Sequence, residues 1–249
     1  MFSRKSLFNL YAKMERLVVP KLKYSQYVYE EVLTAVVGNN LKWLDLGCGH
    51  QVLPSWRCEQ EKGLVEKAGL VVGIDADLPS VEKHRSIHLK AVGNISALPF
   101  KTSTFDLVTA NMVVEHLDNP AVQFQEVSRV LKTGGLFIFH TPNARGYSTI
   151  LARLLPEGLK PGLIRVLQGR PDEDVFKTHY RVNSETDIAR LAETNAFETV
   201  KVRSIVTSAQ FVVVPPLALL ELLWIRLLLT KPFRQLRTNL IVTLKKRPN

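Results

Sequence analysis

The stretch WLDLGCGHQV, residues 43–52, decides the fold, because it is an apolar run that breaks into a glycine turn. Asp45 lies inside the run, and Gly47 and Gly49 follow on either side of a cysteine. A strand that ends in such a turn and leads into a helix presents backbone N–H groups to an anionic or polar ligand. The dinucleotide fingerprint G-x-G-x-x-G needs a third small residue, but Val52 stands at that position. The turn therefore predicts a ligand site and disfavours NAD.

Three further apolar runs follow, each about the length of a buried strand. They are LVVGIDAD (70–77), FDLVTANM (105–112) and GGLFIFHTPN (134–143). Between the last two, NPAVQFQEVSRVLKTGG (119–135) carries apolar residues near helical spacing and ends in a glycine stop. Short apolar strands that alternate with helices are typical of a parallel sheet covered on both faces.

The two ends of the chain add helices and strands to this pattern. Helical spacing predicts helices over 5–18 and 25–37, and Ser184 is the expected N-cap of a later helix. A strand follows around 199–206, and TNLIVTLKK (238–246) alternates as a final strand. We therefore predict an α/β fold: a Rossmann-like, doubly wound, mostly parallel sheet with an antiparallel C-terminal strand and helices on both faces.

Ligands of open parallel sheets bind in the crevice beyond the carboxyl ends of the strands. Several polar or glycine positions stand at or just past such ends, and we expect one crevice to collect them. These positions are Asp45, Gly47, Asp75, Asn111 and His140.

Four motifs carry a family resemblance. WLDLGCG, VVGIDAD, VGNISALPFKTSTFDLVTANMVVEHLDNP and EVSRVLKTGGLFIFHTPN resemble, in this order, the motifs of class I S-adenosylmethionine-dependent methyltransferases. The similarity is to the branch that acts on small molecules and lipids and includes quinone- and sterol-methylating enzymes. It covers roughly residues 25–205 and the final strand. It implies S-adenosyl-L-methionine as the cofactor.

The resemblance also implies how the cofactor would be held. Gly47 and Gly49 would let the backbone approach its methionine and ribose portions, where a Cβ would clash. Asp45 suits its ammonium group. Asp75, at the end of the second strand, resembles the acid that accepts hydrogen bonds from both ribose hydroxyls.

Two further positions are expected to meet the adenine. The family commonly has an acid where Asn94 stands, but an amide oxygen still accepts from the adenine amino group, and Ile95 would pack on the adenine face. The complete set implied for the cofactor is Asp45, Gly47, Cys48, Gly49, Asp75, Ala76, Asn94, Ile95 and Asn111.

The chain departs from the family pattern at the methionine end of this site. Gln51 replaces the third glycine of the family's turn, and PSWRCEQEKGLVEK (54–67) lengthens the segment before the ribose acid, as a longer start of a helix or as an insertion. With Asn94, these departures leave open that the chain binds the cofactor without catalysing a reaction.

Methyl transfer from a sulfonium is mainly an in-line displacement, so positioning supplies most of the acceleration. An oxygen acceptor of high pKa needs a general base, for which histidine is the usual candidate. The catalytic candidates, in order, are His116, His140 and His179, with Glu115 as a weaker option. A structural role stays open for each.

Metal chemistry finds little support in the sequence. Cys48 and Cys58 are the only cysteines, too few for a thiolate zinc site, and no histidine pair has metal-binding helical spacing. His84 and His88 lie in a polar stretch and are expected to be solvated. We predict no metal and, because no secretory leader pattern opens the chain, a cytoplasmic protein.

The net charge of +10 is concentrated at the two ends of the chain, and the most apolar stretch, QFVVVPPLALLELLWIRLLLTKPFR (210–234), lies between the last two strands. A helix over 217–229 would be about 20 Å long, short of the ~30 Å hydrocarbon core, so it should not span a membrane. We expect residues 211–229 to make a peripheral, monotopic contact with the inner face of the cytoplasmic membrane. A homodimer interface, a lid over an apolar substrate and ordinary core are the alternatives.

This organisation predicts a basic amphipathic helix at 1–24 and a methyltransferase domain over 25–249, with an apolar helical insertion at about 207–236. Nucleic acid is not an expected partner, because the basic ends are interleaved with leucines rather than with base-stacking aromatic residues.

Together these features predict a methyltransferase that acts on a hydrophobic or membrane-associated small molecule, such as a lipid, a quinone precursor or a lipid-linked sugar, with an oxygen acceptor slightly favoured. A methyltransferase of a soluble metabolite is the first alternative. The second is a non-catalytic protein that binds the cofactor or serves as a membrane-associated partner.

Overall fold

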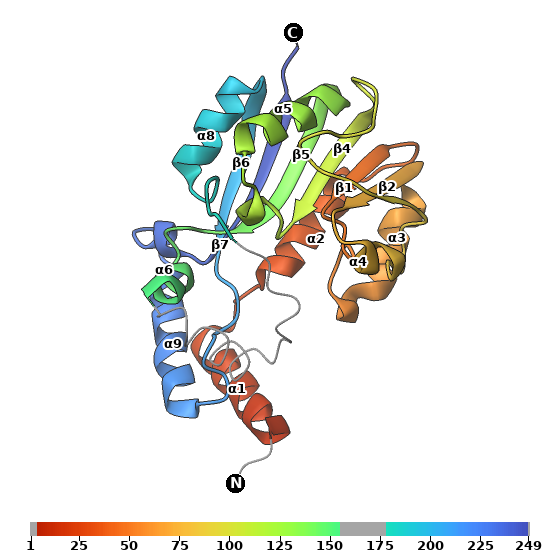
Figure 1. Cartoon of the computed structure of the whole chain (residues 1–249). Coiled ribbons are helices and arrows are strands. Elements are labelled where there is room, and N and C mark those ends of the chain that lie inside the picture. The colour runs from red at the N-terminus through yellow and green to blue at the C-terminus, as the bar shows by residue number, and fades with distance from the viewer. Residues whose placement is uncertain (1–3, 155–177, 249) are drawn as a thin grey trace. The chain divides into compact units, whose positions relative to one another are not determined.

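The computed structural model describes residues 4–154 and 178–248, so the first three residues of the expected N-terminal helix lie outside the described part (Figure 1). The chain divides into two compact units. The sheet unit comprises Gln26–Thr141, Thr178–Arg203 and Leu240–Asn249, and the helical unit comprises Met1–Ser25, Pro142–Lys177 and Ser204–Asn239.

A seven-stranded mixed sheet with the order β3-β2-β1-β4-β5-β7-β6 forms the sheet unit, and its C-terminal strands are antiparallel. The predicted α/β fold is confirmed. The strands are β1 (Lys42–Leu46), β2 (Leu70–Asp75), β3 (Leu89–Val92), β4 (Phe105–Asn111), β5 (Leu131–Pro142), β6 (Phe197–Ile205) and β7 (Asn239–Lys246). β1 pairs in parallel with β2 on one side and β4 on the other. The strand order therefore reverses between β1 and β4, which is where ligands bind in such sheets.

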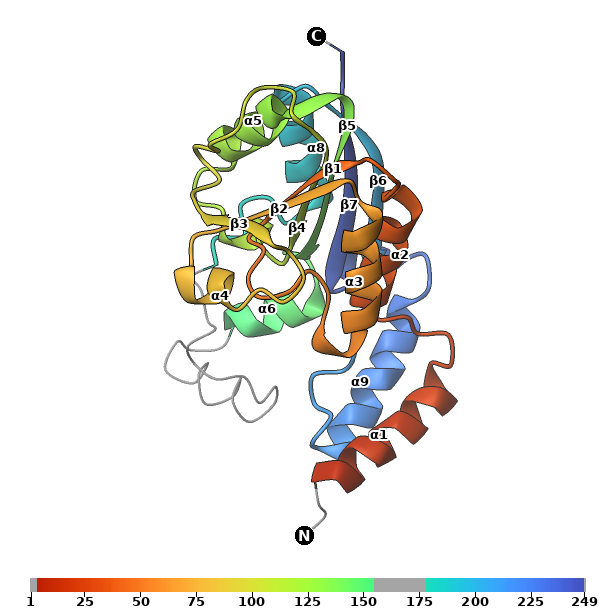
Figure 2. The same ribbon diagram turned by 90° about the vertical axis from the view of Figure 1, so that its right-hand side faces the viewer.

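Helices cover both faces of this sheet. They are α2 (Ser25–Val36), η1 (Ser55–Arg57), α3 (Cys58–Lys67), α4 (Leu78–Glu82), η2 (Val114–His116), α5 (Pro120–Val130) and α8 (Glu185–Thr194). Figures 1 and 2 show α5 and α8 on one face and α2 and α3 on the other. Phe124 of α5 makes edge-on ring contacts with Phe137, Phe139 and Phe197 and so fastens α5 to the sheet.

One expected boundary is wrong, because α5 ends at Val130 and the glycine pair lies inside β5. Gly134 has a φ of 79°. A Cβ on Gly135 would lie 3.1 Å from the carbonyl oxygen of Asp106 on β4. The two glycines therefore let β5 pass close to β4 where the pairing register shifts, instead of stopping the helix. The expected cap of α8 is confirmed, since the Ser184 side chain accepts the N–H of Asp187.

The helical unit contains α1 (Arg4–Val18), α6 (Tyr147–Leu154), α9 (Pro215–Leu228) and η5 (Arg234–Leu236). α1 and α9 lie side by side and share an apolar core, in which Tyr11 packs with Leu222 and Ile225 (Figures 1 and 2). α9 begins at Pro215, where the missing proline N–H costs nothing at a helix start. No described helix combines the length and the apolar character that a membrane crossing requires.

A buried carboxylate holds α9 in its unit. Glu221 accepts the backbone N–H groups of Gln210 and Phe211 and the hydroxyl of Tyr147 in α6. At the other end of the helix, the Arg237 guanidinium donates to the carbonyl oxygen of Leu228. Charged side chains thus satisfy backbone groups of the segment before α9 and of its last turn.

Candidate functional site

The glycine turn after β1 requires glycine for two different reasons. Gly47 and Gly49 have φ angles of 58° and 52°, in the left-handed region that side chains disfavour. A Cβ on Gly47 would also lie 2.4 Å from Cγ2 of Val113, whereas a Cβ on Gly49 would meet nothing within 4 Å. The buried Cys48 anchors the turn, because its N–H donates to the carbonyl oxygen of Ile74.

The Asp75 carboxylate is held by the backbone of two turns. Its Oδ2 accepts the N–H of Gly49 at 2.8 Å, and its Oδ1 accepts the N–H of Asp77 at 2.9 Å. The side chain stands at the end of β2, and Ala76 beyond it is exposed. Each carboxylate oxygen can accept a further hydrogen bond, so this geometry suits a vicinal diol.

Asp45 is a buried residue of β1 that lies opposite Thr109 of β4. It is 2% exposed, and its Oδ1 accepts the hydroxyl of Thr109 at 2.5 Å. Burial, together with the nearby carboxylates of Glu61 and Asp75, raises the pKa of Asp45 to about 7. Among the described residues no lysine or arginine forms an ion pair with it. A buried carboxylate without a cation favours a ligand that brings an ammonium group.

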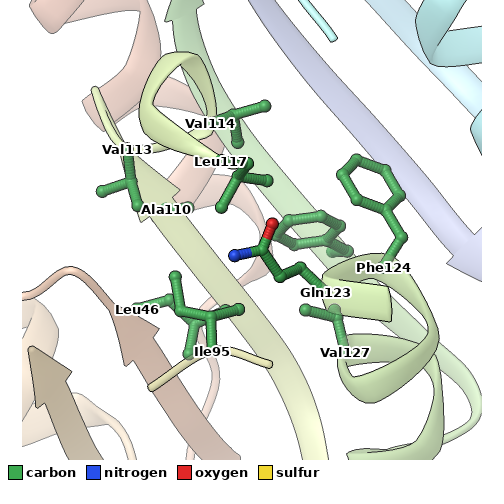
Figure 3. Close-up of a pocket in the computed structure, with 10 residues that line it drawn as sticks. Leu46, Ile95, Ala110, Val113, Val114, Leu117, Gln123, Phe124 and Val127 are labelled. Atoms are coloured by element: carbon green, nitrogen blue, oxygen red, sulfur yellow. The ribbon is translucent and has the colours of Figure 1, made fainter. Parts of the chain in front are cut away.

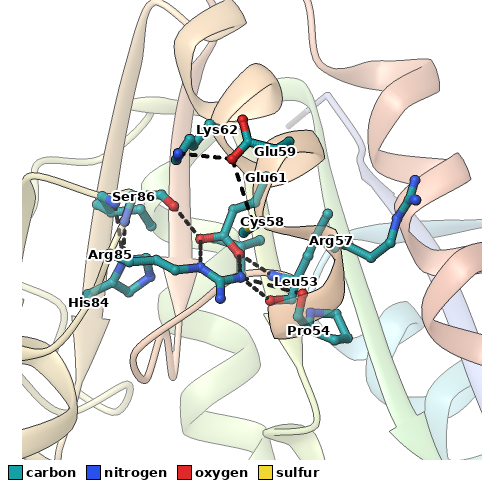
Figure 4. A network of polar contacts seen from close by, with 12 residues as sticks. Leu53, Pro54, Arg57, Cys58, Glu59, Glu61, Lys62, His84, Arg85 and Ser86 are labelled. Atoms are coloured by element: carbon teal, nitrogen blue, oxygen red, sulfur yellow. Dashed lines mark hydrogen bonds and ion pairs between the residues drawn. The ribbon is translucent and has the colours of Figure 1, made fainter.

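The lengthened segment after the glycine turn is braced by a buried ion pair (Figure 4). It forms the short η1 turn and then α3, so the added residues lead into a helix. Glu61 of α3 accepts the N–H of Leu53 and two bonds from Arg85, whose guanidinium also donates to the carbonyl oxygen of Leu53. Arg57 is bound to Glu30 of α2 in the same way. These bonds hold the chain next to the glycine turn in one position.

The expectation that His84 is solvated is wrong. His84 is buried, and its Nδ1 accepts the N–H groups of Ser86 and Ile87. Burial lowers the pKa of His84 to about 4, so the ring is neutral. The residues just after His84 thus supply the backbone N–H groups that bind its ring. His88 is exposed, as expected.

His140 and Asn111 form one hydrogen-bonded unit at the ends of β5 and β4. Nδ1 of His140 lies 2.9 Å from Oδ1 of Asn111, and because that oxygen only accepts, the proton belongs on Nδ1. Asn111 donates in turn to the carbonyl oxygen of Val52 and to Oε1 of Gln26 in α2. His140 is 1% exposed, and burial lowers its pKa to about 3. The neutral ring therefore orients Asn111 toward the segment after the glycine turn.

Glu115 joins the segments that carry the two other candidate histidines. His116 ends the η2 turn next to it and is half-buried. The backbone oxygen of Glu115 accepts the N–H of His179 at 2.7 Å. Its buried carboxyl group accepts the hydroxyl of Thr141, which accepts from Asn183. Burial raises the pKa of Glu115 to about 7.

The two expected adenine residues lie in the loop after β3. Asn94 is exposed, and its Oδ1 accepts the N–H of Ser96 at 2.8 Å. Ile95 is half-buried and lines an apolar pocket of the sheet unit. Within the described ranges no three His, Cys, Asp or Glu side chains gather as metal ligands.

Sequence reasoning missed the partners that hold these groups. Thr109 lies beside Asp45 in the register of β1 and β4, so the signal was present only once that pairing was known. Arg85 and Asn183 come from distant segments, and no local pattern identified them.

Comparisons with known proteins identify the family of this chain. A family model described as "Methyltransferase domain" matches residues 20–202. The ubiquinone biosynthesis O-methyltransferase of Colwellia psychrerythraea is 31% identical over 145 residues, which are 55% of each chain. The demethylmenaquinone methyltransferase of Corynebacterium kroppenstedtii is 30% identical over 118 residues, 45% of this chain and 51% of that protein. The chain thus spans about half the length of the curated relatives it matches.

Among solved structures, an S-adenosylmethionine-dependent methyltransferase from Mesorhizobium loti superposes with a TM-score of 0.56 at 18% identity, covering 87% of this chain and 96% of that one. This likeness shows the same fold. The family match extends from before α2 into β6 and includes the glycine turn, Asp75 and the segment after β4. The chain belongs to the class I S-adenosylmethionine-dependent methyltransferase family.

Proposed function

We propose that this protein transfers a methyl group from S-adenosyl-L-methionine to a hydrophobic or membrane-associated small molecule, with oxygen as the favoured acceptor atom. The observation that carries this proposal is the pair of carboxylates at the glycine turn. Asp45 is buried and has no described cation, and half-buried Asp75 is held by two backbone N–H groups. An ammonium group and a ribose diol are the complementary chemistry.

Each site residue receives a role on this basis. Asp45 binds the ammonium group, and Asp75 accepts the ribose hydroxyls next to Ala76. Gly47, Cys48 and Gly49 form the backbone cradle. Asn94 and Ile95 face the adenine, and Asn111, oriented by His140, lines the methionine end.

The bound cofactor supplies an activated methyl group, and the protein has to align an acceptor with it. His116 is our first candidate for the group that removes the acceptor proton, because it is half-buried beside the end of β4. His179 is tied to the same segment through Glu115. His140 acts as a positioning residue, since its buried neutral ring already holds Asn111.

The acceptor class is supported by two observations. The names of two relatives refer to ubiquinone biosynthesis and to demethylmenaquinone. The helical unit also exposes many large apolar side chains, among them Leu220 at 63% and Leu17 at 82%. A hydrophobic acceptor is therefore consistent with the names of these relatives and with the exposed apolar side chains of the helical unit.

Calorimetric titration with S-adenosylmethionine and S-adenosylhomocysteine tests the function. We expect Asp75→Ala to lower the affinity for both ligands by about 100-fold or more, because two charge-assisted hydrogen bonds are lost. Asp77→Ala is the matched control: Asp77 caps α4 through the N–H of Ser80, so its loss should cost about 1 kcal/mol of stability and leave binding nearly unchanged. A folded wild type that binds neither ligand would rule the function out.

We also propose that α9, within residues 211–229, rests on an anionic bilayer. Leu217, Leu220, Leu223 and Leu227 are exposed and recur every three or four residues, so they share one face of the helix. The described ranges of the helical unit contain twelve lysines and arginines but only two glutamates, which accounts for the whole net charge. Leucines that insert among lipids and cations that meet anionic headgroups are typical of a monotopic contact.

Flotation with vesicles checks this contact. We expect binding to phosphatidylcholine vesicles with about one-third phosphatidylglycerol, and much weaker binding without the anionic lipid. Leu220→Ser with Leu223→Ser should abolish flotation, whereas Leu78→Ser with Leu89→Ser, at similarly exposed leucines of the sheet unit, should not. A concentration-dependent dimer that the first pair dissolves, without flotation of the wild type, would assign the face to a second copy of the chain instead.

A further inference from the structure

The side-chain amide of Asn111 uses its full hydrogen-bonding capacity within the chain. Asn111 ends β4, just before Val113, which lines the small apolar pocket of the sheet unit (Figure 3). Its Oδ1 accepts from Nδ1 of His140 at 2.9 Å and from Nε2 of Gln26 at 3.4 Å. Its Nδ2 donates to the carbonyl oxygen of Val52 at 3.1 Å and to Oε1 of Gln26 at 3.2 Å. An amide has two lone pairs and two N–H protons, so Asn111 keeps none for a ligand.

Of the residues bound to Asn111, Gln26 is the one most easily released. Its two hydrogen bonds are the longest of the set, and hydrogen bonds weaken as they lengthen. His140 and Val52 are each 1% exposed, so neither can exchange its bond for one to water. Gln26 is half-buried and stands in the first turn of α2, where the helix is least restrained by its own hydrogen bonds. Water can therefore replace the bonds of Gln26 at low cost.

The rest of α2 is held in place by contacts that do not depend on Gln26. One turn further along the helix, the Tyr29 ring lies against the His140 ring, with 5.8 Å between the two centroids. Glu30 binds the Arg57 guanidinium through both of its carboxylate oxygens. Release of Asn111 therefore needs only a new rotamer of the Gln26 side chain and no movement of the helix.

The amide of Gln26 presents Asn111 with one donor and one acceptor. The amino-acid end of S-adenosylmethionine carries the same combination, because its ammonium group donates and its carboxylate accepts. The proposed function assigns Asn111 to this end of the cofactor. Since Asn111 has no hydrogen-bonding capacity left, a ligand that binds it there has to displace Gln26.

We propose that Gln26 is an autoinhibitory latch: in the ligand-free protein its amide takes the place of the cofactor's amino-acid end on Asn111, and the cofactor displaces it on binding. This inference rests on the proposed function and adds a regulatory residue that lies outside the four sequence motifs. The latch keeps Asn111 satisfied in the ligand-free protein, where an amide without partners would destabilise the fold. Only molecules in which the latch is open are ready to bind, so the latch lowers the apparent affinity.

Calorimetric titration with S-adenosylhomocysteine, which has the same amino-acid end, tests the latch. Gln26→Ala removes the competing amide, so we expect this variant to bind the ligand about fivefold more tightly than the wild type. Gln125→Ala makes the same change at an exposed position of α5 and should keep the wild-type affinity. The sign of the change is diagnostic, because removing a glutamine that contacts the bound ligand would weaken binding. Equal or weaker binding by Gln26→Ala overturns the latch.

NMR spectra of the wild type give a second test that needs no variant. When S-adenosylhomocysteine saturates the protein, the side-chain amide signals of Gln26 should move to the shifts of a solvated glutamine, whereas those of exposed Gln125 should stay there throughout. Gln26 signals that do not move in this way overturn the latch and leave the methyltransferase proposal standing. A folded wild type that binds neither S-adenosylmethionine nor S-adenosylhomocysteine overturns both.

Discussion

Replacing Gly47 by alanine is expected to lower the free energy of unfolding by roughly 3 kcal/mol. The same substitution at Gly49 is expected to lower it by only about 1 kcal/mol. Both residues have a positive φ, so both substitutions impose the same backbone strain. Only the Cβ at Gly47 would collide with Val113, whose three side-chain carbons would lie 2.4, 3.0 and 3.3 Å away. A β-branched side chain has no rotamer that removes all three contacts. Urea denaturation of the two variants measures the difference.

A double variant isolates the collision from the strain. Val113→Ala removes both methyl groups that meet the new Cβ, so Gly47→Ala in that background should cost little more than Gly49→Ala. If Gly47→Ala is equally destabilising with and without Val113, the packing of Val113 over the turn is not the cause. Gly47→Ala should also weaken the binding of S-adenosylmethionine, because the glycine turn that would hold the cofactor is the same backbone that the substitution strains.

Replacing Asp45 by asparagine should stabilise the ligand-free protein at pH 8 by up to about 4 kcal/mol while abolishing cofactor binding. The pKa of Asp45 is about 7 in the folded protein and near 3.9 in an unfolded chain. Between these values the folded state holds a proton that the unfolded state has released. The free energy of unfolding therefore falls as the pH rises from about 4 to 7, and it stays low above that range. Asparagine cannot ionise and avoids this loss.

Thermal unfolding with and without S-adenosylmethionine checks this prediction. At or below about pH 4 the two proteins should have similar melting temperatures, because Asp45 is then protonated in both the folded and the unfolded state and is close to asparagine in charge and size. At pH 8 the variant should melt higher without ligand, and the wild type should gain stability on adding the cofactor whereas the variant should not. Glu115 also has a raised pKa, but it is unchanged in both proteins and cancels in the difference. A variant that melts below the wild type at pH 8 contradicts the prediction.

Local patterns were sufficient for most of the architecture. Apolar runs located β1, β2, β4 and β5, and helical spacing located α1 and α2. The strand that escaped, β3, has only four residues and none of them is fully buried, so it lacks the apolar signal of a central strand. Gly134 and Gly135 were wrongly predicted to stop a helix, because glycines are also required where a strand passes close to its neighbour, as β5 does beside β4.

Most of the candidate site was also predictable, because parallel strands end at one edge of the sheet. Asp45, Asp75 and Asn111 were expected there from their places in the sequence, and the structure brings them to the ends of neighbouring strands. The state of each side chain was not predictable. His140 proved to be buried and neutral, because its pKa depends on the residues packed around it and not on its neighbours in the chain.

The sequence by itself determined the fold class, the glycine turn, the strand-end acids and the family, since each depends on residues adjacent or periodic along the chain. Only the tertiary structure decided that Thr109 binds Asp45, that Arg85 braces the segment after the turn and that Gln26 pairs with Asn111. The partners in the first two pairs lie 64 and 24 residues apart along the chain. Burial and hydrogen bonding across such separations arise from packing, which no local pattern of residues records.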